Sequence, residues 1–155
     1  MYLRVIGDCF SENIFKEIEA FTNYGILYFK KVRHDEEKKI IFIPVERCQI
    51  KAVKKMFLGA TTSYKYDKNV TIPSWIAIRN ITECQVENNF DDPSISKIRL
   101  LFGMHVKPKE KEIYIGSVEE DRGKTCYRMK LKVSEVDIEI GDQNETTPWN
   151  GVRQR

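Results

Sequence analysis

The sequence predicts a mainly β protein at the margin of the α+β class: an antiparallel two-sheet sandwich or partly open barrel with one N-terminal helix packed against it. Apolar and polar residues alternate along most of the chain after residue 26, as in half-buried strands. Polar, turn-forming segments separate several of these stretches. A short unit with one apolar spacing also recurs three times.

Composition favours a single folded domain. The 155 residues are 41% hydrophobic and 32% charged, which excludes the disordered class. No apolar run approaches the roughly 20 residues that cross a bilayer, so we expect no membrane association and a cytoplasmic protein. We expect one β-rich domain over residues 1–140 and a polar C-terminal tail over 141–155.

The helix is predicted near the N-terminus, after a short strand at Tyr2–Ile6. Ser11 is a suitable N-cap, and an apolar stripe follows at helical spacing. The stripe consists of Ile14, Phe15, Ile18 and Phe21. Gly25 is predicted to end the helix as a left-handed residue. We therefore expect a helix from Ser11 to Tyr24 whose stripe packs on a sheet.

Strands are predicted in six segments after the helix. They are Ile26–Arg33, Lys39–Val45, Ser74–Arg79, Ile95–Val106, Glu112–Val118 and Cys126–Ile140. Residues 34–38 and 119–124 are acidic and are expected at hairpin tips. Residues 59–69 are polar and are expected in a loop. Residues 49–58 fit a helix or a strand, and the sequence does not decide between them.

The recurring unit places apolar residues at positions 1, 4 and 6. It occurs at residues 45–51, 81–87 and 133–139. Alternate side chains of a strand share a face, so a step of three brings the apolar set onto one core only if the chain bends. We expect bends near residues 46–47, 82–83 and 134–135. Each bend would carry a strand from one sheet to another or around a barrel corner.

A hairpin precedes the first and third copies of this unit, which lie 88 residues apart. The pattern is consistent with an internal duplication of a hairpin plus bent strand. It is equally consistent with coincidence, because aliphatic-rich strands resemble one another. Both explanations stay open.

Motifs for catalysis are missing from the sequence. It contains no G-x-S-x-G, glycine-rich phosphate loop, H-E-x-x-H or dinucleotide fingerprint, and only two histidines. The four cysteines form no C-x-x-C pair. His34-Asp35-Glu36-Glu37 has the composition of a cation site but suits a solvated turn. We therefore predict no catalytic residue, metal site or cofactor.

Basic residues concentrate between positions 26 and 66, which contain ten Lys or Arg and four acids, whereas the whole chain has a net charge of +3. The candidate binding residues in this region are Arg47, Lys51, Lys54, Lys55, Tyr64 and Tyr66. Lysine attracts polyanions, and tyrosine stacks on bases.

Three functional hypotheses follow from these features. The first is a non-catalytic binding or self-assembly module, with a protein partner or a second copy of the chain. The second is a protein that binds nucleic acid or another polyanion through residues 30–65. The third is an enzyme whose acidic site is assembled from distant residues. We favour the first, because the sequence contains abundant strand-forming segments and no recognisable reactive motif, and the other two are alternatives.

Overall fold

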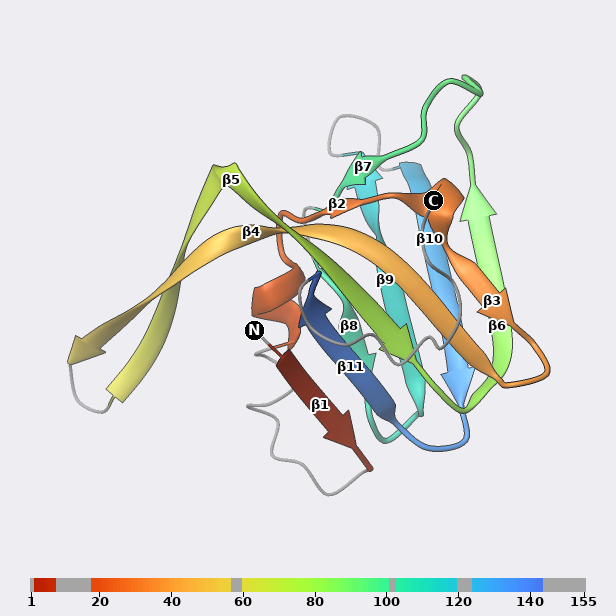
Figure 1. Ribbon diagram of the computed structural model, residues 1–155, viewed down its shortest axis with the longest axis horizontal. Helices are drawn as coiled ribbons and strands as arrows, with labels where there is room; N and C mark the ends of the chain where they lie inside the picture. The colour runs from red at the N-terminus through yellow and green to blue at the C-terminus, as the bar shows by residue number, and fades with distance from the viewer. Residues whose placement is uncertain (1, 8–17, 57–59, 101–102, 120–123, 144–155) are drawn as a thin grey trace.

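The computed structural model describes residues 2–7, 18–56, 60–100, 103–119 and 124–143, with the backbone alone for 52–56, 60–64, 117–119 and 124–126. Two antiparallel sheets pack face to face without closing into a barrel, which confirms the predicted sandwich (Figure 1). In Figure 1 the seven-stranded sheet lies in front of the four-stranded sheet.

The seven-stranded sheet has the order β1-β11-β5-β4-β2-β7, and β3 also pairs with β4. These strands are β1 (Tyr2–Ile6), β11 (Asp137–Asp142), β5 (Ala60–Ile78), β4 (Ile40–Met56), β2 (Ile26–Leu27), β7 (Ile98–Arg99) and β3 (Arg33–Asp35). The four-stranded sheet has the order β6-β10-β9-β8. Its strands are β6 (Ile81–Asn88), β10 (Lys124–Val133), β9 (Glu112–Glu119) and β8 (His105–Lys107).

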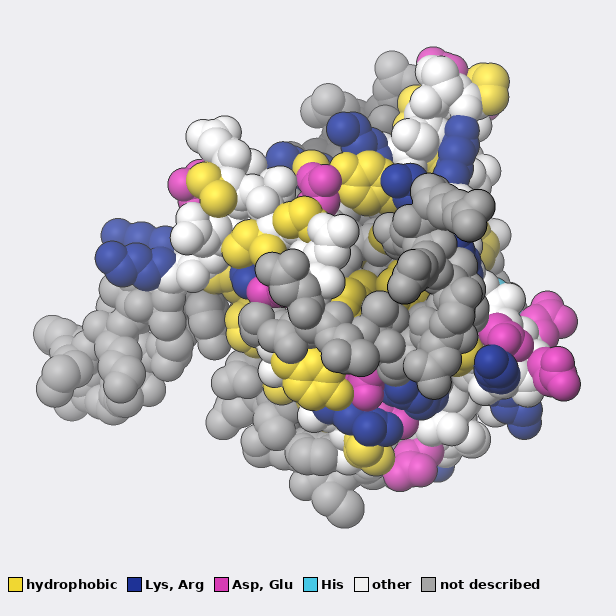
Figure 2. Space-filling model, in the orientation of Figure 1, with side chains coloured by type: hydrophobic (Ala, Val, Ile, Leu, Met, Phe, Trp, Pro, Cys, Tyr) yellow, Lys and Arg dark blue, Asp and Glu magenta, His cyan; other side chains and the backbone are white. Residues whose placement is uncertain are grey.

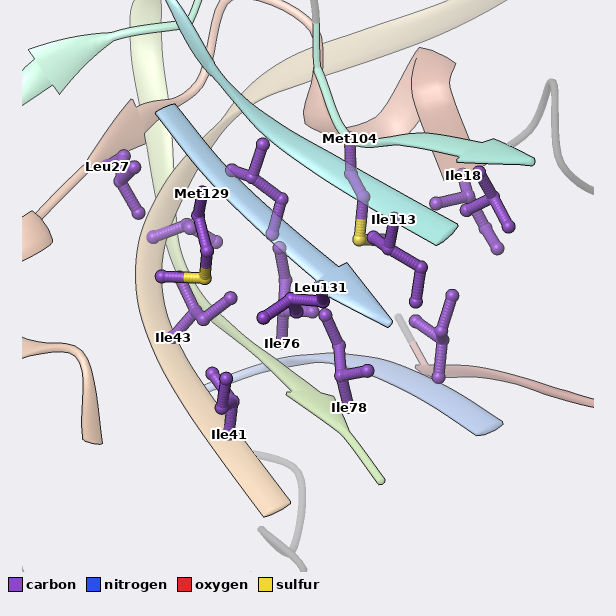
Figure 3. Packing of buried hydrophobic residues seen from close by; sticks show 14 of the residues in the cluster. Ile18, Leu27, Ile41, Ile43, Ile76, Ile78, Met104, Ile113, Met129 and Leu131 are labelled. Atoms are coloured by element: carbon purple, nitrogen blue, oxygen red, sulfur yellow. The ribbon is translucent and has the colours of Figure 1, made fainter. Parts of the chain in front are cut away.

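The core lies between the two sheets. It is built from every second side chain along the strands, those that point toward the opposite sheet. It includes Ile41 and Ile43 of β4, Ile76 and Ile78 of β5, and Leu131 of β10, all fully buried (Figure 3). Burying a side chain of this size contributes about 1.5–3 kcal/mol. The alternation that predicts the strands therefore also predicts which face carries the core.

Helical residues within the described chain are 18–22, and the predicted start at Ser11 lies outside the described residues. Ile18 is fully buried against the core, as the apolar stripe predicts. The prediction that Gly25 is the left-handed residue after the helix is wrong. Tyr24 has a φ of 61°, whereas Gly25 does not have a positive φ. A Cβ on Gly25 would lie 3.2 Å from the carbonyl oxygen of Glu46, so this glycine serves close packing against β4.

The structure agrees with the three predicted bends to different extents. The third is confirmed, since β10 ends at Val133 in one sheet and β11 begins at Asp137 in the other, and the predicted bend at 134–135 lies in the connection 134–136. At the second, Lys132 pairs with Glu83 and Val133 with Ile81, which leaves Thr82 as a bulge. The first is misplaced, because β4 is regularly paired through residues 46–47 and the register shifts only between Cys48 and Gln49.

Three predicted segments differ from the structure. The predicted strand at 26–33 is interrupted by a 3-10 helix, η1 (Phe29–Lys31). Among the described residues of the predicted strand at 95–106, only β7 and the first two residues of β8 are strand. The predicted loop at 59–69 is strand from Ala60 onward. Of residues 49–58, compatible with helix or strand, 49–56 are strand and 57–58 lie outside the described residues. The predicted tail begins within β11, which runs through Asp142.

Candidate functional site: the β4–β5 arm

Strands β4 and β5 extend beyond the sandwich as a two-stranded ribbon. We call residues 49–56 of β4 and 60–67 of β5 the arm. Their pairing runs from Gln49 opposite Asp67 to Met56 opposite Ala60. At about 3.3 Å per residue, the arm is about 25 Å long. Within the described chain, no third strand pairs with the arm, and Figure 1 shows it leaving the body of the molecule.

A bulge marks the point where the arm leaves the sandwich. Cys48 pairs with Thr71, whereas the next residue, Gln49, pairs with Asp67. Residues 68–70 of β5 are therefore left without strand partners. The carboxylate of Asp67 accepts a hydrogen bond from the backbone N–H of Asn69 at 3.0 Å, which supports the local turn. Because a bulge bends a strand and increases its twist, the arm takes a new direction here.

Tyr66 attaches one side of the arm to the helix. Its hydroxyl donates a hydrogen bond to the carbonyl oxygen of Ala20 at 2.9 Å. Its ring packs edge-on against Tyr24, with 5.0 Å between the ring centroids. The ammonium of Lys68 lies 4.1 Å from the centroid of the Tyr24 ring. A cation over an aromatic face adds a favourable electrostatic contact, so the arm is fixed where it meets the helix.

Arg47 attaches the base of the arm to β11. Its guanidinium donates two hydrogen bonds to the carboxylate of Asp142, at 2.8 and 2.9 Å, and the hydroxyl of Ser74 donates a third at 3.0 Å. Burial alone would raise the pKa of Asp142, but the hydrogen bonds from Arg47 and Ser74 outweigh it and hold the pKa well below its usual range. Asp142 therefore stays ionised at neutral pH and fixes Arg47.

Glu46 is also satisfied within the sandwich. It accepts hydrogen bonds from the hydroxyl of Tyr28 at 2.8 Å and from the hydroxyl of Thr71 at 3.3 Å. The hydrogen bond to Glu46, together with burial, raises the pKa of Tyr28. Glu46, which precedes Arg47 at the base of the arm, is thus held by neutral hydroxyls. It is not paired with the arm's lysines in any of the described contacts.

The arm and its base are strongly basic. Residues 47–71 contain six Lys or Arg and one Asp, a net charge of +5. Lys51 and Lys65 lie directly opposite each other on adjacent strands, and both are exposed. Among the described side chains, neither has an acidic partner. Figure 2 shows dark blue side chains where the arm projects from the body. Like charges in opposite positions of a strand pair are unfavourable unless an anion neutralises them.

The structure describes the side chains of three of the six predicted binding residues, and these three have two roles. Arg47 and Tyr66 are engaged at the base of the arm, whereas Lys51 is exposed on it. Lys54, Lys55 and Tyr64 lie on the arm's strands, and their side chains are outside the described set. The basic region 30–65 includes Lys65, but neither Lys65 nor Lys68 is among the six predicted binding residues, because the register that places Lys65 opposite Lys51 has no local sequence signal.

Other candidate sites show no convergent chemistry in the described chain. Asp35 accepts a hydrogen bond from the backbone N–H of Lys38 at 2.9 Å, as in a solvated turn, and His34 is exposed. His105 pairs with Glu19 on the surface. No group of His, Cys, Asp or Glu among the described residues has the arrangement of a metal site. No described helix is long and apolar enough to span a membrane.

No known protein family, curated protein or solved structure matches this chain. The arm is therefore interpreted from its own geometry and charge.

Proposed function

We propose that the protein is a non-catalytic binding module that contacts a polyanion, with nucleic acid as the class of partner, through the β4–β5 arm. The observation that carries this proposal is the facing pair of exposed lysines, Lys51 and Lys65, on a projecting ribbon. A phosphate backbone supplies the closely spaced negative charges that such a pair lacks.

The shape of the arm supports the same partner. A two-stranded ribbon has little stability of its own in water, since it buries no core. The arm is held instead by contacts at its base, from Arg47 to Asp142 and from Tyr66 to Ala20. The major groove of B-DNA, about 12 Å wide, admits a two-stranded ribbon of this kind. A ribbon that projects with Lys51 and Lys65 exposed is suited to lie along such a groove or a phosphate backbone.

The test is binding of a mixed-sequence duplex DNA, measured by fluorescence anisotropy over a series of salt concentrations. Each phosphate contact contributes about 0.9 to the slope of log K against log salt. Replacing Lys51 and Lys65 by Ala should weaken binding and reduce that slope by about 2. The matched control replaces Lys97 and Lys109, exposed lysines outside the arm, and should leave the slope unchanged. Charge reversal at Lys51, Lys54 and Lys55 should abolish binding.

Two results would contradict the proposal. One is the absence of binding to duplex DNA, single-stranded DNA and heparin even at low salt. The other is an equal loss of binding in the control variant, which would show that net charge alone matters. Comparing DNA with heparin also distinguishes recognition of a nucleic acid from recognition of any dense anion.

Self-assembly is the second candidate function, and one observation favours it. The acidic turn at residues 35–37 precedes β4, whereas the arm is formed by the far end of the same 17-residue strand. Along the strand, at about 3.3 Å per residue, the two ends are separated by about 50 Å, so the acidic turn and the arm lie at opposite ends of β4. A second copy would bring the two together. Sedimentation equilibrium tests this candidate, and a strict monomer at high concentration would contradict it.

A further inference from the structure

Strand β6 forms one edge of the four-stranded sheet. It pairs with β10 on one side, and within the described chain no strand pairs with its other side (Figure 1). It is eight residues long, whereas β8 at the opposite edge has three. Proteins usually shorten, bulge or charge such edges, because an unpaired edge is a template for another strand. The bulge of β6 lies at Thr82, which leaves residues 83–88 as a regular edge strand.

The hydrogen bonds of β10 determine which backbone groups of β6 face the open side. The N–H of Val133 donates to the carbonyl oxygen of Lys111 at 3.0 Å, in the direction of β9. The N–H of Ser134 donates to the carbonyl oxygen of Asn80 at 3.0 Å, in the direction of β6. Backbone groups alternate in direction along a strand, so every second residue of β10 bonds to β6. These residues are Arg128, Lys130 and Lys132, and they lie opposite Glu87, Gln85 and Glu83.

The remaining residues of the edge direct their N–H and C=O groups away from the sheet. They are Cys84, Val86 and Asn88. No other described backbone group bonds to them. The side chain of Val86 shares the inward face with Met129, its partner on β10, but Val86 is 51% exposed and Met129 only 1%. The edge therefore combines open backbone groups with an exposed apolar side chain.

This edge is complementary to a second copy of itself. Two antiparallel β6 strands related by a two-fold axis at Val86 bring that residue opposite its own counterpart. The same axis places Cys84 of one copy opposite Asn88 of the other. All of these residues direct their backbone groups to the open side, so each pair exchanges two main-chain hydrogen bonds. The contact is isologous and closes as a dimer.

The acidic side chains of β6 do not oppose this contact. Glu83 lies 3.4 Å from the ammonium of Lys132, and Glu87 lies 3.1 Å from the guanidinium of Arg128. Both pairs join β6 to its own neighbour β10. The negative charge of the edge is therefore compensated within each copy.

The neighbouring registers are less favourable than the one centred on Val86. In the favoured register, Glu87 lies opposite Gln85 of the second copy. An axis one residue earlier would place Glu83 opposite Glu87, and like charges in opposite positions are destabilising. An axis two residues earlier would bring the bulge at Thr82 into the pairing. A bulge disrupts the ladder of hydrogen bonds.

We propose that β6 pairs with β6 of a second copy of the chain, antiparallel and with Val86 on the two-fold axis. The pairing joins two four-stranded sheets into one continuous sheet. It is independent of the proposed function of the arm, because no residue of the arm takes part. In Figure 1 the arm and β6 lie on opposite sides of the body, so the dimer leaves both arms accessible.

Hydrogen exchange resolved by residue, measured by nuclear magnetic resonance at low and high protein concentration, tests the pairing. In the monomer, the amides of Cys84, Val86 and Asn88 should exchange rapidly, whereas those of Gln85 and Glu87 are protected by β10. Raising the concentration should slow exchange at the first three positions several-fold. The rates of Gln85 and Glu87 should change much less. Sedimentation equilibrium over the same range should show a dimer.

Val86→Lys tests the position of the axis. It places two ammonium groups next to each other and removes an apolar contact, so the dissociation constant of the dimer should rise by about tenfold or more. Val70→Lys is the matched control, because Val70 is 42% exposed and lies outside β6. This control should dimerise as the wild-type chain does. Lys51→Ala combined with Lys65→Ala should also leave the dimer intact, which separates this contact from assembly through the arm.

The outcomes distinguish β6 from other surfaces. A chain that stays monomeric at high concentration, with rapid exchange at Val86 throughout, would refute the pairing. A dimer that persists in Val86→Lys and is lost in the Lys51 and Lys65 variant would refute it in favour of the arm. A dimer whose β6 amides remain rapid would refute it in favour of another surface. If circular dichroism shows that Val86→Lys does not fold, the exchange rates of the wild-type chain still decide.

Discussion

Replacing Asp142 by Asn tests how the arm is held to the sandwich. Arg47 donates two hydrogen bonds to this carboxylate, and the side chains are only 12% and 17% exposed. A hydrogen bond to a charged group contributes about 1.5–3 kcal/mol, and breaking a fully buried ion pair costs about 3–5 kcal/mol. Because the pair is not fully buried, we expect Asp142→Asn to lower the free energy of unfolding by about 2–3 kcal/mol.

Urea denaturation followed by circular dichroism measures this change. For an m-value of about 2 kcal/mol/M, the midpoint should fall by about 1–1.5 M at neutral pH. The pKa of Asp142 is lowered in the folded state, so its contribution is fully present above its unfolded value of about 3.9 and is lost as the pH falls. The difference between wild type and Asp142→Asn should therefore be constant near neutral pH and shrink below about pH 4.

A matched control and a mutant cycle make the result specific. Glu110→Gln makes the same chemical change on an exposed turn and should alter stability by less than about 0.5 kcal/mol. Arg47→Gln, alone and combined with Asp142→Asn, gives the coupling energy of the pair. The reasoning fails if Asp142→Asn is as stable as wild type at pH 7. It also fails if the stability difference is the same at pH 3 as at pH 7.

Three further predictions concern single contacts. Gly103→Ala should cost about 3 kcal/mol or more in thermal denaturation, because its Cβ would lie 2.0 Å from Oγ1 of Thr22; near-wild-type stability would contradict the packing. Burial, followed by the nearby charge of Cys84, raises the pKa of Tyr127 to about 12. Since the unfolded state releases this proton from about pH 10, stability should fall between pH 10 and 12, by up to about 2–3 kcal/mol, and Tyr127→Phe should remove this contribution; an unchanged alkaline slope would contradict it. Tyr66→Phe should cost about 1 kcal/mol and speed hydrogen exchange in the arm, unless its hydroxyl is solvated instead of bonded to Ala20.

Much of the sandwich could be predicted because buried apolar residues follow a regular spacing along its strands. In the third recurring unit, Val133, Val136 and Ile138 are all buried, and the step of three is met by a crossing between sheets. In the second unit only Ile81 is buried and Val86 is 51% exposed, yet the same step is met by a bulge at Thr82. The spacing therefore predicts an interruption of the strand, whereas the extent of burial depends on the opposite sheet.

The arm could not be predicted by the same reasoning. Periodicity identifies strands through alternating burial, and residues 60–67 are mostly polar although they pair with β4 as a strand. Their polar composition therefore favours a loop. The break after Leu27 has a different cause, since Phe29 turns into the core and stacks on Tyr127 with 5.0 Å between the ring centroids. That contact joins residues far apart in the sequence and leaves no local pattern.

The candidate site was predictable in charge but not in geometry. The excess of lysine marks the segment of the chain that forms the arm, and Lys51 is exposed on it. The role of Arg47 depended on Asp142, which is 95 residues away and reaches it only because β11 pairs with β5. Likewise, Lys65 opposes Lys51 only because three residues of β5 are bulged out, which sets the register of the arm.

These contacts give the arm a defined direction, and that bears directly on binding. The base is held by Arg47 on β11, by Tyr66 on the helix and by the bulge between Cys48 and Gln49. A partner that binds an arm ordered in advance avoids the entropic cost of ordering it, which otherwise subtracts from affinity. Weakening the base through Asp142→Asn should therefore reduce affinity even though Asp142 itself would repel an anion. Removing a nearby negative charge alone would raise affinity, so the sign of the change separates ordering of the arm from simple electrostatic attraction.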